Sequence, residues 1–223
     1  MPDPALTHLH LPPRRETGDK PPLLVLLHGV GSNEQDLFSL AGELDPRFAV
    51  VSARAPFTRF PGSYAWFDVE MLPGGEFRID PGMWEESRGQ LEAFITEAVA
   101  HYDADPGRVH LVGFSQGAIM SLSIMLTNPS LVAGVAAMSG RLLPEVRPLV
   151  RPGAELAGFP VLVVHGTEDA VIPVRYGREV NEFLQTLPVE LAYQEFPMGH
   201  QVSAASLELV STWLTAHLDR SRG

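Results

Sequence analysis

Apolar residues occur along the chain in two kinds of pattern. Short runs in which nearly every residue is apolar, as at 23–27, are typical of strands buried on both faces of a parallel sheet. Longer segments carry apolar residues at spacings of three and four, as at 84–102, which predicts helices with one buried face. Because the two patterns alternate, the predicted fold class is α/β, with a mostly parallel central sheet and helices on both faces.

The predicted elements cover most of the chain. Strands are predicted at 23–27, 48–53, 108–113, 131–139, 160–165 and 189–196, and helices at 34–44, 84–102, 116–128, 173–187 and 203–218. No internal repeat or linker interrupts this order, so one domain is expected over 1–223, with its core at about 21–218. The connection at 140–159 is too short to hold an inserted cap domain.

One segment, 55–83, departs from the alternation. It is rich in proline, glycine and aromatic residues, which predicts a long ordered loop with one short strand at 64–69. Long ordered loops often line functional sites, although their aromatic residues also serve simply as anchors.

The charge balance excludes several classes of partner. The chain has 16 Lys and Arg against 27 Asp and Glu, a net charge of −11, so it is expected to repel nucleic acid and anionic lipid surfaces. It holds no stretch of about 18 uninterrupted apolar residues, and its N-terminus lacks the basic and apolar regions of a signal peptide. The sequence therefore predicts a cytoplasmic protein with no membrane span and no nucleic-acid partner.

Residue types exclude most cofactor chemistry. With no cysteine, disulfides, thiolate metal sites and cysteine nucleophiles are all excluded. The single lysine, Lys20, lies in a polar N-terminal turn, so a buried Schiff-base lysine is not expected. No cofactor and no metal are predicted, because two small polar groups show no metal-ligand spacing: His8 with His10, and His101 with Asp103 and Asp105.

A candidate nucleophile lies between a predicted strand and a predicted helix. Residues 113–117 read Gly-Phe-Ser-Gln-Gly, the Gly-x-Ser-x-Gly pattern that exposes a serine on a tight turn above the sheet. The glycines are needed because side chains there would collide. The following helix would also direct its N-terminal dipole toward a developing oxyanion beside Ser115.

A serine nucleophile needs a base, usually a histidine that a carboxylate orients. In this arrangement the chain order is serine, acid, histidine, and Asp169 is the one aspartate between Ser115 and His200. Glu168 is a rival acid that position alone does not exclude. His165 precedes the acid, and His217 falls in the last predicted helix at a position expected to lie on the surface, which leaves His200 as the base.

Two further sets of site residues are predicted. The oxyanion donors are expected to be the backbone amides of Gln116, which follows the nucleophile, and of Val30, in the glycine-flanked turn after the first buried strand. The predicted apolar lining of the substrate site consists of Phe57, Tyr64, Trp66, Phe67 and Met198.

At these residues the sequence resembles the phospholipase/carboxylesterase family of α/β-hydrolases, which includes acyl-protein thioesterases and compact bacterial carboxylesterases. The resemblance implies the α/β-hydrolase fold and the same catalytic residues and oxyanion donors. The segment 32–37 looks more like the bacterial carboxylesterases, which favours an esterase over a protein depalmitoylase. The matching stretches are 27–31 (Leu-His-Gly-Val-Gly), 55–56 (Ala-Pro), 66–68 (Trp-Phe-Asp), 113–117, the His-Gly-x-x-Asp-x-x-Ile-Pro pattern at 165–173, and 199–200 (Gly-His).

Together these observations predict a serine carboxylesterase that hydrolyses small-molecule esters with short-to-medium acyl groups through an acyl-enzyme on Ser115. Alternatives on the same fold are an acyl-protein thioesterase, a lysophospholipase or a small peptidase. An alternative of another class is a non-catalytic binding protein that keeps the fold. The sequence leaves the oligomeric state open, a homodimer included.

Overall fold

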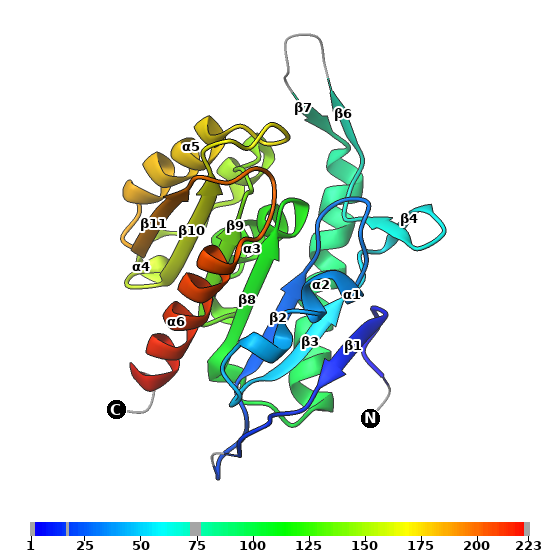
Figure 1. Ribbon diagram of the computed structural model, residues 1–223, viewed down its shortest axis with the longest axis vertical. Coiled ribbons are helices and arrows are strands. Elements are labelled where there is room, and N and C mark those ends of the chain that lie inside the picture. Colours follow the sequence, from blue (N-terminus) through cyan, green and yellow to red (C-terminus); the bar gives the residue numbers. More distant parts are fainter. Residues whose placement is uncertain (1–2, 17, 72–76, 221–223) are drawn as a thin grey trace.

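The computed structural model describes residues 3–16, 18–71 and 77–220. Within them a seven-stranded sheet forms the centre of the molecule (Figure 1). β1 runs antiparallel to its neighbour β3 and all other neighbours are parallel. The strands follow one another across the sheet in the order β1 (His8–Leu11), β3 (Ala49–Ala53), β2 (Leu23–Leu27), β8 (Val109–Phe114), β9 (Gly134–Met138), β10 (Pro160–Gly166) and β11 (Glu190–Phe196).

The all-apolar strands are buried from both sides, as their composition requires. In β2, Leu23, Val25 and Leu27 pack into one hydrophobic cluster, whereas Leu24 and Leu26 point to the opposite face and join a second. Alternating side chains of a strand face opposite sides of a sheet, so a strand without polar positions needs cover on both.

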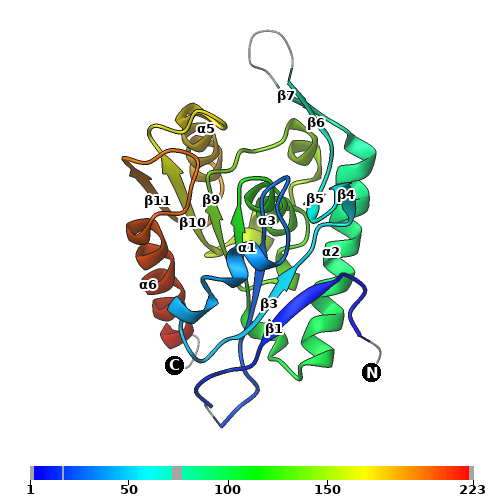
Figure 2. The ribbon, with the colours of Figure 1, turned by 45° about the vertical axis from the view of Figure 1, so that its right-hand side comes forward.

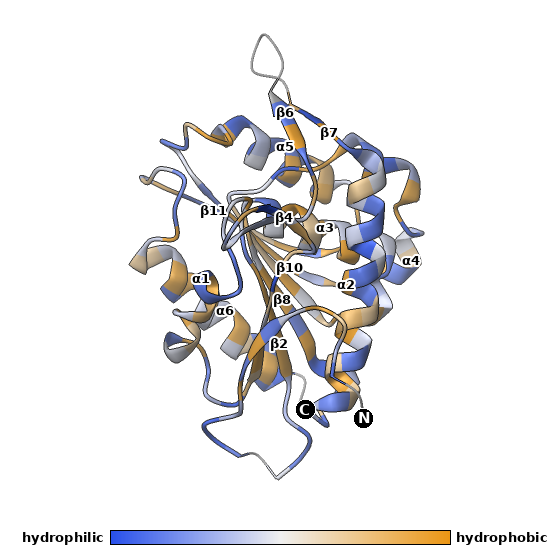
Figure 3. Cartoon of the chain, turned by 90° about the vertical axis from the view of Figure 1, so that its right-hand side faces the viewer, coloured by the Kyte–Doolittle hydropathy of each residue, from blue (hydrophilic) through white to orange (hydrophobic). Residues whose placement is uncertain are grey.

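Helices supply that cover. On the first face, cluster residues come from α2 (Pro81–His101), α3 (Gln116–Thr127), α4 (Gly153–Leu156) and α5 (Val174–Gln185). On the second face they come from α1 (Gln35–Phe38) and α6 (Ala204–Arg220). Figure 3 shows the hydrophobic strands between α1 and α6 on one side and α2 and α3 on the other. The predicted mostly parallel sheet with helices on both faces is confirmed.

Short 3-10 helices punctuate the connections at Ala41–Glu43, Pro106–Arg108, Pro129–Leu131 and Pro144–Leu149. The first of these corrects the helix predicted at 34–44, which the structure breaks into α1 and the turn at Ala41–Glu43. Gly42 lies inside that segment, and glycine disfavours a continuous helix. Leu37, Ala41 and Leu44 nevertheless all face the second cluster, so the apolar spacing that predicted a helix reflects real burial.

The segment 55–83 holds more strand than its composition predicts. It forms two antiparallel hairpins, β4 (Phe57–Phe60) with β5 (Ser63–Ala65), and β6 (Val69–Met71) with β7 (Phe77–Ile79). Residues 72–76 of this segment lie outside the described residues. The β6–β7 hairpin lies at one end of the molecule, and in Figure 2 the chain termini lie toward the other.

Helix α2 begins earlier than predicted, at Pro81. Asp80 caps it, because Oδ1 accepts hydrogen bonds from the amides of Gly82 and Met83 at 2.9 and 3.0 Å. A proline in the first turn is favourable because that position needs no N–H donor.

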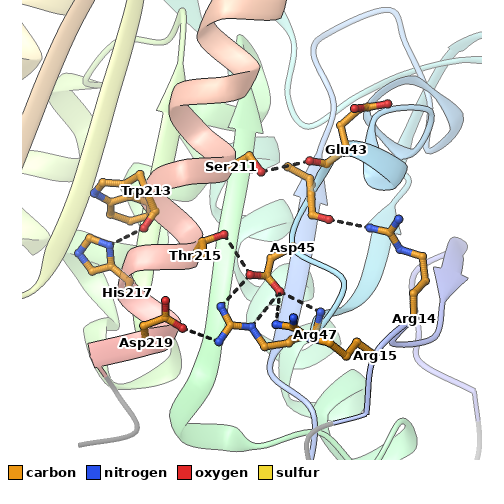
Figure 4. A network of polar contacts seen from close by, with 11 residues as sticks. Arg14, Arg15, Glu43, Asp45, Arg47, Ser211, Trp213, Thr215, His217 and Asp219 are labelled. Atoms are coloured by element: carbon orange, nitrogen blue, oxygen red, sulfur yellow. Dashed lines mark hydrogen bonds and ion pairs between the residues drawn. The ribbon is translucent and has the colours of Figure 1, made fainter.

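A polar network joins the connection before β3 to the last helix (Figure 4). Asp45 and Arg47 form a buried ion pair at 2.7 Å. From α6, Thr215 donates a hydrogen bond to Asp45 at 3.0 Å, and Asp219 pairs with Arg47 at 2.5 Å. Burial opposes the ionisation of Asp45, but the hydrogen bonds from Arg47 outweigh it and lower the Asp45 pKa to about 2.

The connection from β9 to β10 contains only the 3-10 turn at Pro144–Leu149 and the four-residue α4. No cap domain is inserted there, as the length of this segment predicts. Within the described parts of the chain, no helix combines the length and hydrophobicity that a membrane span requires.

Candidate active site

Ser115 occupies the sharp turn between β8 and α3. Its φ of 55° and ψ of −117° lie outside the usual regions for a residue with a side chain. Two glycines make the turn sterically feasible: a Cβ on Gly113 would lie 2.2 Å from the carbonyl oxygen of Gly117, and one on Gly117 only 1.9 Å from that of Leu27. The turn is therefore specified by the spacing of glycines around the serine.

Ser115, His200 and Asp169 form a hydrogen-bonded chain at the carboxyl ends of the parallel strands. His200 Nε2 lies 2.9 Å from Ser115 Oγ, and His200 Nδ1 lies 2.7 Å from Asp169 Oδ2. The three residues follow β8, β11 and β10. This is the edge at which ligands bind in open α/β sheets.

Asp169, and not its rival Glu168, meets the histidine. The Asp169 side chain is fully buried, whereas Glu168 is exposed. Asp169 Oδ1 accepts hydrogen bonds from the amides of Val171 and Ile172 at 2.9 and 2.8 Å, which leaves Oδ2 for His200. The loop after β10 therefore holds the carboxylate through hydrogen bonds that do not involve His200.

Among the described residues, neither of the two other downstream histidines hydrogen-bonds to Ser115, although His165 Nε2 lies 3.6 Å from Asp169 Oδ2. His165, at the end of β10, is buried and its Nε2 is 2.7 Å from the carbonyl of Ile172, so it braces the Asp169 loop from within. Burial lowers the His165 pKa, which keeps this ring neutral. His217 is half-buried on α6, where its Nδ1 lies 2.7 Å from the carbonyl of Trp213.

The proposed oxyanion donors lie on either side of Ser115. A Cβ built on Gly29 would be 3.2 Å from Ser115 Cβ, so the turn that carries Val30 touches the serine directly. Two hydrogen bonds hold this turn against β5. The amide of Gly31 donates to Tyr64 O at 2.8 Å, and the amide of Tyr64 donates to Ser32 O at 2.9 Å. Among the described residues, neither the Val30 nor the Gln116 amide has a protein acceptor.

The side chain of Gln116 ties the long loop to the serine turn. Its Oε1 accepts from the amide of Trp66 at 2.7 Å and its Nε2 donates to Phe67 O at 2.6 Å. The Trp66 indole in turn donates to His28 O at 3.0 Å. His28 Nε2 accepts from the amide of Ala55 at 3.0 Å. These hydrogen bonds join four of the six matching stretches of the sequence, 27–31, 55–56, 66–68 and 113–117, in one buried network.

Of the five residues predicted to line the substrate site, the structure brings one to a cavity at Ser115. Phe67 lines this cavity of about 80 Å³. Trp66 is fully buried behind it, and Met198 packs in the second cluster with α6. Phe57 and Tyr64 lie in the β4–β5 hairpin, outside the described lining.

Several lining residues carry no signal in the sequence. Burial lowers the pKa of one of them, Arg141, which is the one charged side chain of the described lining. Only its position just after a buried strand hints at a site, because that is the carboxyl edge of the sheet. The lining residues that sequence reasoning missed are Val69, Phe77, Ile119, Arg141, Val171 and Ile172.

A larger hollow of about 500 Å³ lies along the β6–β7 hairpin, with Arg59, Asp68, Glu70 and Arg78 among its lining residues. It does not reach Ser115. Among the described residues no cluster of three His, Asp or Glu side chains could hold a metal ion. Of the pair formed by His8 and His10, His8 has its Nε2 at 2.6 Å from the hydroxyl of Tyr102.

Comparison with known proteins gives consistent results. The Phospholipase/Carboxylesterase family model matches residues 15–218. An acyl-protein thioesterase 1 from Gibberella zeae is 31% identical over 168 residues, covering 72% of this chain and 69% of that protein. A protein of Oryza sativa subsp. japonica named "probable inactive carboxylesterase" is 29% identical over 210 residues, covering 89% of this chain and 85% of its own.

Solved structures show the same fold. A carboxylesterase from Mesorhizobium loti superposes with a TM-score of 0.81 at 24% identity, covering 96% of this chain and 97% of its own. At that identity the likeness speaks for the α/β-hydrolase fold.

Proposed function

Because the chain belongs to the phospholipase/carboxylesterase family, whose members are serine hydrolases of the α/β-hydrolase type, we propose that it hydrolyses short acyl esters through an acyl-enzyme on Ser115. The observation that carries this proposal is the chain of two hydrogen bonds from Asp169 through His200 to Ser115, of 2.7 and 2.9 Å. Small-molecule esters as substrates and a cytoplasmic location belong to the same proposal.

In the first half of the proposed reaction, His200 Nε2 takes the proton of Ser115 Oγ as that oxygen attacks the ester carbonyl carbon. The amides of Val30 and Gln116 donate hydrogen bonds to the resulting oxyanion. When the intermediate collapses, the C–O bond to the alcohol breaks and His200 gives its proton to the leaving alkoxide. Asp169 holds the imidazole in the tautomer with its proton on Nδ1 and stabilises the imidazolium.

In the second half, His200 removes a proton from water, which attacks the acyl-enzyme carbonyl. Collapse of this second intermediate breaks the bond to Ser115 Oγ, returns the proton to that oxygen and releases the acid. The enzyme returns to its starting state, and one water is consumed for each ester cleaved.

The size of the cavity favours the short end of the acyl range. Its volume of about 80 Å³ is well below the several hundred Å³ of a typical ligand pocket. It has room for about three water-sized groups. Acetyl to butyryl groups fit this space, whereas longer chains would extend over the exposed Val30 and Val171 at the rim.

The test is hydrolysis of p-nitrophenyl acetate, butyrate, octanoate and palmitate, combined with intact mass after fluorophosphonate treatment. We expect highest activity on the two shorter esters, and loss of both activity and labelling in Ser115→Ala. Ser121→Ala, one turn along α3, is the matched control: its hydroxyl is also buried but only donates to the carbonyl of Gly117 at 2.9 Å. It should keep both.

The other assignments predict different results in the same assay. With acyl thioesters added to the series, a thioesterase, the activity named for the Gibberella zeae relative, would cleave each thioester faster than the matching ester. A non-catalytic binding protein would neither turn over the esters nor be labelled, and the rice relative is named as a probable inactive carboxylesterase. Either result would contradict the proposal.

A further inference from the structure

Arg141 is placed beside the nucleophile by the way β9 ends. The amide of Ser115 donates to the carbonyl of Met138 at 2.9 Å, which joins the serine turn to the end of this strand. A Cβ on Gly140 would lie 2.7 Å from Ala118 Cβ, so the chain after β9 runs directly against the first turn of α3. Arg141 follows at once and lines the same cavity as Ser115.

The guanidinium is held in position without a carboxylate. Its Cζ lies 5.0 Å from the ring centroid of Phe77 and 5.7 Å from that of Tyr176, contacts that orient a cation over aromatic faces. Among the described residues, no Asp or Glu oxygen lies within 4.0 Å of its nitrogens. The Tyr176 hydroxyl and the more distant Glu145 and Glu179 are the groups that favour its charge.

Burying the Arg141 guanidinium costs free energy when no anion lies beside it. Only 8% of Arg141 is exposed, and its burial lowers its pKa, yet an arginine stays protonated at neutral pH. A buried cation is normally paired with an anion, and this one faces a small, otherwise apolar cavity. None of its nitrogens is among the fully enclosed unpaired polar atoms of the described residues, so a ligand can reach them.

We propose that Arg141 is an anion-binding group of the substrate site and that the preferred esters carry a carboxylate a few bonds from the scissile carbonyl. This inference rests on the proposed esterase function and narrows its substrate class. The carboxylate supplies the partner that the fold withholds from Arg141, and the guanidinium fork binds it with two N–H donors. The overall charge of −11 gives such a substrate no general attraction, so selectivity depends on this one local cation.

The distance available limits the substrate. Ser115 and Arg141 line one cavity with room for about three water-sized groups, so we expect a short spacer, of about two or three carbons, between the carbonyl and the carboxylate. Half-esters of short dicarboxylic acids satisfy this when the charge is on the acyl side. Esters of a small hydroxy or phenolic acid satisfy it when the charge is on the alcohol side.

The test compares charged esters with neutral esters of the same shape. Monoethyl succinate is paired with ethyl levulinate, in which a methyl group replaces the carboxylate oxygen, and 2-acetoxybenzoate is paired with 2-acetoxyacetophenone. We expect wild-type kcat/KM to be higher for the charged member of at least one pair. In Arg141→Met it should fall about tenfold to a hundredfold for that member and less than about threefold for its neutral partner.

Two further variants separate recognition from structure. Arg175→Met removes a neighbouring positive charge that also lies over Tyr176, at 4.6 Å from its ring centroid, but is exposed and outside the described lining. It should leave the charged-to-neutral ratio unchanged, and Arg141→Lys should retain part of it. Arg141→Met should unfold at the same or a higher temperature than wild type, because it replaces a buried unpaired cation with an apolar chain.

The inference is overturned if neither pair shows a preference for the charged ester, or if Arg141→Met lowers both members of each pair equally. In those cases fluorophosphonate labelling of Ser115 and hydrolysis of the neutral esters would persist, so the esterase proposal would stand. Absence of labelling in the wild type would instead refute the esterase proposal and, with it, this inference.

Discussion

At Ser115 the sharp turn of the site strains the backbone of a single residue. A non-glycine residue at φ 55° stores about 1–3 kcal/mol of strain, which the surrounding contacts must offset. Asp169, in contrast, is stabilised by its surroundings, because its Oδ1 accepts two backbone hydrogen bonds that hold the carboxylate beside His200. Single substitutions can therefore test the proposed role of each side chain separately.

At the same scale we predict the effect of Asp169→Asn. An amide can donate to His200 Nδ1, which would move the histidine proton to Nε2 and leave no base for Ser115. kcat/KM for p-nitrophenyl butyrate should fall by about 10⁴, with the thermal midpoint nearly unchanged. Steady-state kinetics with calorimetry measures both.

Glu168→Gln is the matched control for that substitution, because this neighbouring acid is exposed and does not contact His200. Its kcat/KM should stay within about twofold of wild type. A large loss here with a small one in Asp169→Asn would reverse the assignment of the acid.

At the scale of elements, the site depends on how closely β2, β8 and α3 approach one another. Glycines on both sides of Ser115 allow the start of α3 to lie against the end of β2. Because Leu27, Gly29 and Ser115 meet at this junction, a shift of α3 would move Ser115 relative to the turn that carries Val30.

We therefore predict opposite effects for two Gly→Ala substitutions in helices. Gly117→Ala places a Cβ 1.9 Å from the backbone oxygen of Leu27 and should destabilise the protein by about 3 kcal/mol or more, with loss of activity. Gly89→Ala in α2 meets nothing within 4 Å and should stabilise it by about 0.5–1 kcal/mol with activity kept. Urea unfolding measures both, and equal stabilities would show that the β2–α3 junction can relax.

At the scale of the whole molecule, segments far apart in the sequence must be held together on one face of the sheet. The connection before β3 and the C-terminal part of α6 lie on the same face, and the Asp45–Arg47 pair links them (Figure 4). Asp45 and Arg47 precede the amino end of β3, whereas Ser115, Asp169 and His200 follow the carboxyl ends of the parallel strands, so the effect of this pair on stability is separable from chemistry.

Asp45→Asn should lower the free energy of unfolding at pH 7 by about 2–4 kcal/mol, because it removes the negative charge that balances the buried guanidinium of Arg47. Asp219→Asn, whose side chain is 62% exposed, is the control and should cost less than about 1 kcal/mol. Denaturant unfolding at pH 7 measures both.

The same pair predicts a pH dependence with a definite sign. The pKa of Asp45 is about 2 in the fold against an ordinary 3.8, so the unfolded chain binds more protons in that interval. Its contribution of about 2 kcal/mol is present above pH 4 and disappears as the pH falls through 2. The stability difference between wild type and Asp45→Asn should shrink over this window, and a constant difference would contradict the prediction.

Much of the fold followed from local patterns. The alternation of apolar runs and helical spacings predicted six strands of the central sheet. Five of them are buried on both faces and have the apolar runs typical of a parallel sheet, whereas the sixth, β11, is a half-exposed edge strand. Edge strand β1 and the two hairpins in 55–83 are short and half-exposed, and such strands leave little hydrophobic pattern. The break in the helix predicted at 34–44 depends on packing that spacing alone does not describe.

The sequence by itself determined the α/β class, the glycine-flanked serine and the chain order of Ser115, Asp169 and His200, because these depend on residues that are neighbours or follow one another along the chain. Only the tertiary structure brought Asp169 rather than Glu168 against His200, set the size of the cavity and brought Arg141 beside Ser115. These are contacts between loops that follow different strands. Their partners are chosen by the order of strands across the sheet, which no local pattern of residues encodes.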